Sequence, residues 1–311
     1  MLRRPLIGLL VAILSGCASR LPPTPAPHAG HLEAFVLAHQ DDWQLFMGDV
    51  AWQAIRTGSR TVFVYTTSGD AGRPAPFWEA REKGALASVA VALGAAPPDT
   101  AGEVGGGRFR VECADSMFSG HAVRRCQLGT SVSYFLRLPD GNLNGQGFPA
   151  TGGRSLMQLA NGIAAPVPTL DGKGSFRSWQ DLVHVVGAVL KVEASAARAS
   201  GAQVQIHATD PDTAFNPRDH ADHRATGRLA AAIANANEWT LLRYAGYSTA
   251  EWPTNLSADQ FAEKTALFMA YDRARVLANP EWSAYAELPR YYSAWLSRTY
   301  TRPTGFTGRS R

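Results

Sequence analysis

Two short clusters of histidine and aspartate in this sequence contain the residue types that bind a metal ion and activate water. The first cluster is His39-Gln40-Asp41-Asp42, and the second is Asp219-His220-Ala221-Asp222-His223. Imidazole nitrogens and carboxylate oxygens are common zinc ligands, and catalytic zinc sites leave one coordination position open. Each cluster alone is a weak signal, because His and Asp often occur as neighbours by chance. Together they predict the two halves of one metal site.

The segments around both clusters indicate that each lies where a strand ends and a helix begins. A mostly apolar run, 32–38, precedes the first cluster, and 45–57 has the pattern of a helix. The second cluster follows the strand-like run 204–209 and opens an apolar helix that includes 229–236. Ligand sites in open α/β sheets form at the carboxyl ends of strands. We therefore expect both clusters at one edge of a sheet, with Asp219 capping the second helix.

The order of the predicted elements indicates the fold class. Strand, helix, strand and helix are followed by an irregular segment, and then by alternating helices and strands. This order predicts an α/β fold with a doubly wound, mostly parallel sheet. The irregular segment, about 105–170, contains two strand-like runs between glycine-rich turns, and we interpret it as a β-containing insertion. No Gly-x-Gly-x-x-Gly motif opens the first helix, so dinucleotide binding is not predicted.

The two clusters resemble the signatures of the PIG-L/LmbE family of zinc-dependent N-deacetylases, which read His-Pro-Asp-Asp-Glu and His-Pro-Asp-His. Residues 67–72 also resemble the family's Gly-Glu-x-Gly turn, and 81–94 resembles its Arg-x-x-Glu helix. The resemblance covers residues 32–278 and implies a Rossmann-like LmbE fold. Two residues depart from the family pattern. Gln40 replaces the proline, which implies a looser turn, and Trp43 replaces the glutamate, which removes an acidic group.

The resemblance also implies a role for each residue of the two clusters. The cofactor would be Zn²⁺, with another divalent metal as the alternative, and its ligands would be His39, Asp42 and His223. Asp41 would be the general base that takes a proton from water. A protonated His220 would stabilise the oxyanion, and Asp222 would orient the ring of His220 or of another site histidine.

The expected substrate is an N-acylated amino sugar, free or within a glycoconjugate. Candidate substrate contacts are Trp43, Asp70 and Arg224. Trp43 would either stack on a sugar ring or pack in the core. Asp70 would be a turn residue or line the cleft, and Arg224 would contact substrate or pair with a carboxylate. Two other hypotheses are a carbohydrate-binding lipoprotein without turnover and a zinc amidohydrolase acting on peptides or acyl-amino acids.

The ends of the chain indicate export and a lipid anchor. Residues 1–16 have the pattern of a signal peptide, and Leu14-Ser15-Gly16-Cys17 resembles a bacterial lipobox with lipidation at Cys17. Its acyl chains would hold the protein on a membrane. Ala18-Ser19 lacks the aspartate that retains many lipoproteins at the inner membrane, so we expect the outer membrane, facing the periplasm. A proline-rich spacer, 17–30, would lead to a deacetylase domain at 31–300 and a frayed tail at 301–311.

Charge and cysteine content narrow the function classes further. The formal net charge is +4 and the basic residues are scattered, so nucleic-acid binding is not predicted. Besides Cys17, the chain has Cys113 and Cys126. An even pair in an exported protein predicts a disulfide, and the alternative of zinc ligation has no partner residues at matching spacing. The sequence does not indicate the oligomeric state.

Overall fold

A computed structural model describes residues 31–99, 104, 109–163, 166–198, 203–280 and 289–302 of the chain. The expected signal peptide, Cys17, the spacer and residues 303–311 of the expected tail lie outside the described residues. No helix within the described residues is both long and apolar enough to cross a membrane.

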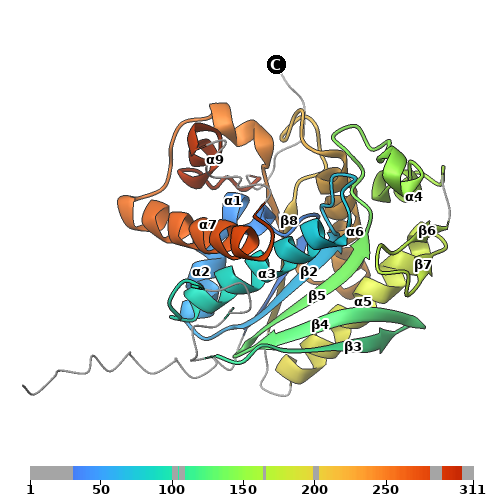
Figure 1. The fold of residues 1–311 in the computed structure, drawn as a ribbon, viewed down its shortest axis with the longest axis horizontal. Helices are drawn as coiled ribbons and strands as arrows, with labels where there is room; N and C mark the ends of the chain where they lie inside the picture. The colour runs from blue at the N-terminus through green and yellow to red at the C-terminus, as the bar shows by residue number, and fades with distance from the viewer. Residues whose placement is uncertain are drawn as a thin grey trace, which may run out of the picture.

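A seven-stranded sheet forms the centre of the protein, with the order β3-β4-β5-β2-β1-β8-β9 (Figure 1). Its strands are β1 (His31–Leu37), β2 (Arg60–Thr67), β3 (Glu112–Phe118), β4 (His121–Leu128), β5 (Ser131–Leu138), β8 (Gln203–Thr209) and β9 (Thr240–Tyr244). The five strands from β5 to β9 are parallel, and β4 and β3 continue the sheet in antiparallel pairing. The predicted α/β fold with a mostly parallel sheet is confirmed.

Helices cover both faces of this sheet, as Figure 1 shows. One face carries α1 (Asp42–Phe46), α2 (Gly48–Arg56), α3 (Ala75–Ala92), α7 (Ala258–Ala278) and α9 (Pro289–Leu296). The other face carries α5 (Trp179–Arg198) and α6 (Ala221–Asn237). Successive residues of β1 alternate between the two cores: Val36 packs on the α5–α6 side and Phe35 on the α1–α3 side. Smaller elements are η1 (Pro149–Thr151), α4 (Leu156–Ala160), η2 (Tyr247–Glu251) and the two-stranded sheet of β6 (Val167–Pro168) and β7 (Ser175–Phe176).

The position of β1 explains why two distant segments meet. β1 pairs in parallel with β2 on one side and with β8 on the other, with Phe35 aligned to His207. The carboxyl ends of β1 and β8 therefore lie side by side at one edge of the sheet. The first cluster follows β1 and the second follows β8, so the sheet brings the two clusters together.

The region expected to be an insertion is largely part of the main sheet. β5 pairs in parallel with β2 and is a central strand, β4 and β3 extend the same sheet, and within the described residues only β6 and β7 form a separate sheet. β4 was not predicted, because His121-Ala-Val-Arg-Arg-Cys-Gln-Leu128 has only three buried side chains and a weak alternating pattern. Cys113 and Cys126 face each other across this hairpin and form the predicted disulfide.

Two local expectations also change. The helix expected at 45–57 is two helices, because the chain turns at Met47, whose φ of −141° is not helical. The start of the expected frayed tail is paired: Thr301 forms a β-bridge with Tyr244, and the backbone N–H of Arg302 donates to the Arg243 carbonyl at 2.8 Å.

Candidate active site

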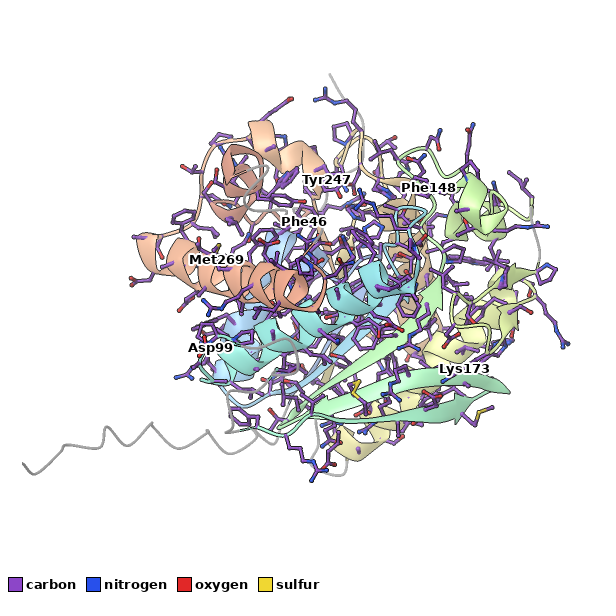
Figure 2. All side chains as sticks on the ribbon, viewed as in Figure 1. Phe46, Asp99, Phe148, Lys173, Tyr247 and Met269 are labelled. Atoms are coloured by element: carbon purple, nitrogen blue, oxygen red, sulfur yellow. A yellow bond between two sulfur atoms is a disulfide. The ribbon has the colours of Figure 1, made fainter. Side chains whose placement is uncertain are left out.

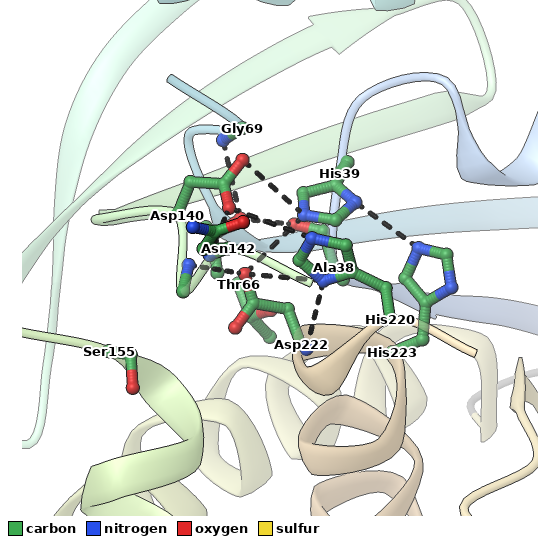
Figure 3. Close-up of polar contacts among 12 residues, drawn as sticks. Ala38, His39, Thr66, Gly69, Asp140, Asn142, Ser155, His220, Asp222 and His223 are labelled. Carbon is green, nitrogen blue, oxygen red and sulfur yellow. Dashed lines mark hydrogen bonds and ion pairs between the residues drawn. The ribbon is translucent and has the colours of Figure 1, made fainter. Parts of the chain in front are cut away.

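Three side-chain atoms from the two clusters converge on one point at the carboxyl edge of the sheet. His39 Nδ1 lies 3.2 Å from His223 Nε2, and Asp42 Oδ1 lies 3.1 Å from the same His223 nitrogen. The third side of this triangle, from His39 Nδ1 to Asp42 Oδ1, is 3.4 Å. The expected ligand set is therefore brought together, and Figure 3 shows the His39 and His223 rings facing each other.

The backbone at the end of β1 fixes the first half of this triangle. Asp42 is the first residue of α1, and its Oδ2 accepts hydrogen bonds from the backbone N–H groups of Ala38 at 2.9 Å and His39 at 2.8 Å. Its carboxylate also lies in the first turn of a helix, where negative charge is favourable. Oδ1 is thereby left to face the two histidines.

The arrangement fits a divalent cation. Ligand atoms about 2 Å from a tetrahedral zinc ion lie about 3.3 Å apart, which matches the three observed distances. The three side chains are almost fully buried, so their charge needs a partner inside the protein. Burial alone would raise the pKa of Asp42, but His223 and His39 hold it well below its usual value. Burial would lower the pKa of His223, but Asp219 and Asp42 raise it to about 10.

Asp41 lies beside the triangle but does not belong to it. Its Oδ1 accepts a hydrogen bond from Arg81 Nη2 at 2.7 Å, and within the described residues its Oδ2 has no hydrogen-bond donor. Burial alone would lower the pKa of Arg81, but the neighbouring Asp41 raises it above its ordinary value, so the guanidinium is charged. Gln40 does not loosen the turn as expected. Its amide donates to the Thr67 carbonyl at 2.9 Å and its oxygen accepts from Arg81 Nε at 3.2 Å.

His220 has a different geometry from the one expected for a protonated ring. It is the N-cap residue of α6, in place of Asp219, and its Nδ1 accepts the backbone N–H of Asp222 at 3.1 Å. A ring that accepts at Nδ1 carries its proton at Nε2 and is neutral. Burial and the neighbouring His39 and His223 lower the pKa of His220 well below its usual value. We therefore interpret His220 as a neutral N–H donor.

Asp222 and Asp140 complete a second group of polar side chains with His39 and His220, shown in Figure 3. Asp222 Oδ2 lies 3.4 Å from His39 Nε2 and accepts the backbone N–H of Gly141 at 2.8 Å. The same Asp222 oxygen lies 3.9 Å from His220 Nδ1, which already accepts a hydrogen bond, so Asp222 is closer to His39 than to His220. Asp140 Oδ1 lies 3.8 Å from His220 Nε2.

A cavity of about 210 Å³ opens beside these residues. Its polar wall consists of His39, Asp41, Asp140, His220, Arg73 and Arg81, and its aromatic wall consists of Phe77, Tyr247 and Tyr292. Sequence patterns alone assign no role to Arg73, Tyr247 or Tyr292, because each comes from a loop or helix whose distance from the clusters depends on tertiary packing. Asp140 carried a usable signal, since it closely follows the strand β5.

Within the described residues, the lining of this cavity includes none of the three expected substrate contacts, and for Trp43 the alternative of core packing is confirmed. Trp43 is fully buried, packs on Phe63 and donates to Tyr65 Oη at 3.0 Å, because α1 turns its indole into the core. Asp70 is also buried, and its two oxygens accept the backbone N–H groups of Asp140 at 2.7 Å and Gly72 at 2.9 Å. Arg224 donates to the Asp219 carbonyl and does not line the cavity.

Comparison with known proteins agrees with the geometry. A family model described as PIG-L, GlcNAc-PI de-N-acetylase, matches residues 34–234, which include both clusters. A crystal structure of a conserved protein from Thermus thermophilus is similar over 88% of this chain and 92% of that one, at 19% sequence identity and a TM-score of 0.37. No curated protein matches the chain significantly.

Proposed function

Because the chain belongs to the PIG-L family of GlcNAc-PI de-N-acetylases, we propose that it is a zinc-dependent hydrolase that removes the acyl group from an N-acylated amino sugar. One observation carries the proposal. Three ligand atoms lie 3.1–3.4 Å apart, and the carboxylate of Asp41 remains beside them, outside the triangle. Arg81 pairs with one oxygen of this carboxylate, while the other oxygen has no donor within the described residues and the side chain lines a cavity, as a proton acceptor for water requires.

The ligand residues would be His39, Asp42 and His223, and a zinc ion bound there would supply Lewis acidity to water and to the acyl carbonyl. Asp41 is the proton acceptor, because its Oδ2 has no hydrogen-bond donor within the described residues and its carboxylate borders the cavity. Arg81 holds the other oxygen, so the carboxylate keeps one orientation. After water has given its proton to Asp41 and attacked the carbonyl, the same carboxyl group returns that proton to the leaving amine.

His220 provides the second contribution to the reaction. His220 lines the cavity, and the hydrogen bond that its Nδ1 accepts from the Asp222 backbone fixes the direction of the ring. A neutral N–H donor in a water-excluded site stabilises the negative charge that develops on the acyl oxygen. The products are a carboxylate and a free amine.

The size and walls of the cavity favour a small amide on a sugar. Its volume of about 210 Å³ lies below the roughly 300–1,000 Å³ of ordinary ligand pockets. This volume favours one sugar residue with a short acyl group over a folded peptide segment. The rings of Phe77, Tyr247 and Tyr292 offer apolar faces, while the charged wall offers hydrogen bonds to hydroxyl groups.

The test is amine release by the zinc-loaded protein from two panels of substrates. One panel contains N-acetylglucosamine and its glycosides, and the other contains N-acetyl amino acids and acylated peptides. We expect release from the sugar panel. Release from the peptide panel alone would favour an amidohydrolase of another specificity, and stoichiometric zinc without release from either panel would favour a binding protein.

Envelope anchoring is part of the proposal, since Cys17 lies outside the described residues. The supporting observation is the lipobox-like Leu14-Ser15-Gly16-Cys17 after an apolar run. We expect Cys17→Ser to move the full-length protein from the membrane fraction to the soluble fraction. Unchanged membrane association of Cys17→Ser would contradict the lipid anchor.

A further inference from the structure

The ring nitrogen of His223 outside the ligand triangle, Nδ1, contacts a carboxylate of the same cluster. Its Nδ1 lies 2.8 Å from Asp219 Oδ1, and both side chains are fully buried. When this ring is neutral and donates its Nδ1–H to the carboxylate, it carries a lone pair at Nε2. That lone pair faces His39 and Asp42, as cation binding requires.

Asp219 is itself fixed by two other donors. Asn216 Nδ2 donates to its Oδ2 at 2.6 Å, and the backbone N–H of Tyr247 donates to its Oδ1 at 3.3 Å. Tyr247 lies close to Phe46 in Figure 2, and its ring packs against His223 with 4.9 Å between centroids. The turn that contains Tyr247 therefore contacts both the carboxylate and the imidazole.

Asn216 uses its whole hydrogen-bonding capacity in this arrangement. Its Nδ2 also donates to the Asp210 carbonyl at 3.1 Å, and its Oδ1 accepts from Gly246 N at 3.0 Å and Ser248 Oγ at 2.9 Å. A fully buried carboxamide with four bonds has one orientation. The donor that it presents to Asp219 is consequently fixed in position.

Gly246 allows the turn to approach this closely. A Cβ atom at position 246 would lie 2.6 Å from Asp219 Oδ1 and 2.8 Å from Oδ2. Both distances are well inside van der Waals contact, so any larger residue would displace Asp219 from His223. The same turn is tied to the end of the chain, because Ala245 N donates to the Tyr300 carbonyl at 2.9 Å.

We propose that Asp219 is a positioning residue, and that Asp219, Asn216 and Gly246 together form a bracket that sets the tautomer and direction of His223 and thereby the affinity for the cation. The proposal rests on the proposed function for the identity of that cation. Partners of this kind on a ligand histidine change metal affinity by about 10–100-fold when they are removed. Nothing else in the second cluster replaces the bracket, since Asp222 faces His39 on the other side.

The test measures zinc affinity of the full chain by chelator competition, with no acylated substrate present. We expect Asp219→Asn to weaken the affinity about 10–100-fold, because the amide keeps the shape but loses the charge. The matched control is Glu33→Gln. It neutralises another histidine–carboxylate pair, His207 Nε2 to Glu33 Oε2 at 2.7 Å, in which the histidine is buried and the glutamate partly buried. Glu33 lies on β1 before the first cluster, so the change should leave zinc affinity unchanged.

A second measurement separates positioning from general destabilisation. The Nδ1 proton of His223 should give a strongly deshielded signal in the zinc-loaded protein, and this signal should move upfield in Asp219→Asn. Wild-type zinc affinity in Asp219→Asn, or an equal loss of affinity in Glu33→Gln, would overturn the proposal. If Asp219→Asn does not fold, Asn216→Ser decides, with a weaker affinity supporting the bracket and an unchanged affinity overturning it.

The outcome is independent of deacetylation. A protein that binds zinc through this bracket but releases no amine would retain the positioning role and lose the proposed function. A protein that releases amine with unchanged zinc affinity in Asp219→Asn would retain the function and lose the positioning role.

Discussion

Replacing Asp41 by asparagine should remove the proton acceptor and leave the three cation ligands in place. An amide has nearly the shape of a carboxylate, and its oxygen can still accept the hydrogen bond from Arg81. It cannot take a proton from water. We expect kcat to fall about 10²–10⁴-fold, the usual contribution of a general base, which corresponds to about 3–5 kcal/mol of activation free energy.

The same change should have a limited effect on stability and none on zinc content. Asp41 and Arg81 are both largely buried, so neutralising the carboxylate weakens a charge-assisted hydrogen bond. The expected loss is about 2 kcal/mol in the free energy of unfolding. Zinc stoichiometry should remain at the wild-type value, because none of the three converging ligand atoms belongs to Asp41.

Asp42→Asn is the matched control, since it makes the same chemical change at the next residue. We expect it to lose zinc, because it removes the negative charge from Oδ1 in the ligand triangle. Amine release, bound zinc and urea unfolding should be measured on both variants. The reasoning is refuted if Asp41→Asn loses zinc while Asp42→Asn retains it, or if Asp41→Asn keeps wild-type kcat.

Three further predictions concern the core, the pH dependence and the hairpin. Trp43→Glu, which restores the family residue, should lower the free energy of unfolding measured in urea by more than about 4 kcal/mol, because it buries an unpaired carboxylate. Wild-type stability of this variant would show that the indole does not pack in the core. Without zinc, the protonated ring of His223 stabilises the fold, because its pKa is raised to about 10 from an ordinary 6.5. This stabilisation is fully present below pH 6.5 and is lost as the pH rises through 10. Zinc must displace that proton, so zinc affinity should rise with pH between about 7 and 9 in a chelator titration, and a flat profile would contradict the protonated ring. Cys126→Ser removes a disulfide between residues 13 positions apart and should lower the free energy of unfolding, measured by thermal denaturation, by about 3 kcal/mol, with kcat unchanged. A lower kcat would mean that the hairpin affects the cavity.

The sequence predicted the parts of the fold in which local pattern and final environment agree. β1 is a mostly apolar run and β8 a strand-like run, and both are largely buried strands in the fold. The alternating pattern of β5 indicates a strand but not its place in the central sheet. Its parallel pairing with β2 depends on a contact between residues about 70 positions apart, which no local pattern records.

For the site as well, local sequence pattern predicted the ligand residues but not the contacts that depend on tertiary packing. The ligand triangle could be predicted because both clusters have distinctive residue types next to strands. The direction of Trp43 could not, since one helical turn decides whether the indole faces the cavity or the core. The roles of Arg81 and Asp219 depend on neighbours that only the folded chain provides, and each alone resembles an ordinary surface or capping residue.

The pairing of β1 with β8 also determines when the three candidate ligands can come together during synthesis. Two of the converging ligands are complete once the chain has been synthesised to residue 42, but the third lies at residue 223. A nascent chain that ends before Gln203 has β2 beside β1 but lacks the strand that carries the second half of the site. Binding of a cation by all three residues can therefore begin only after residue 223 has been synthesised, and bound zinc would report that β8 has docked beside β1.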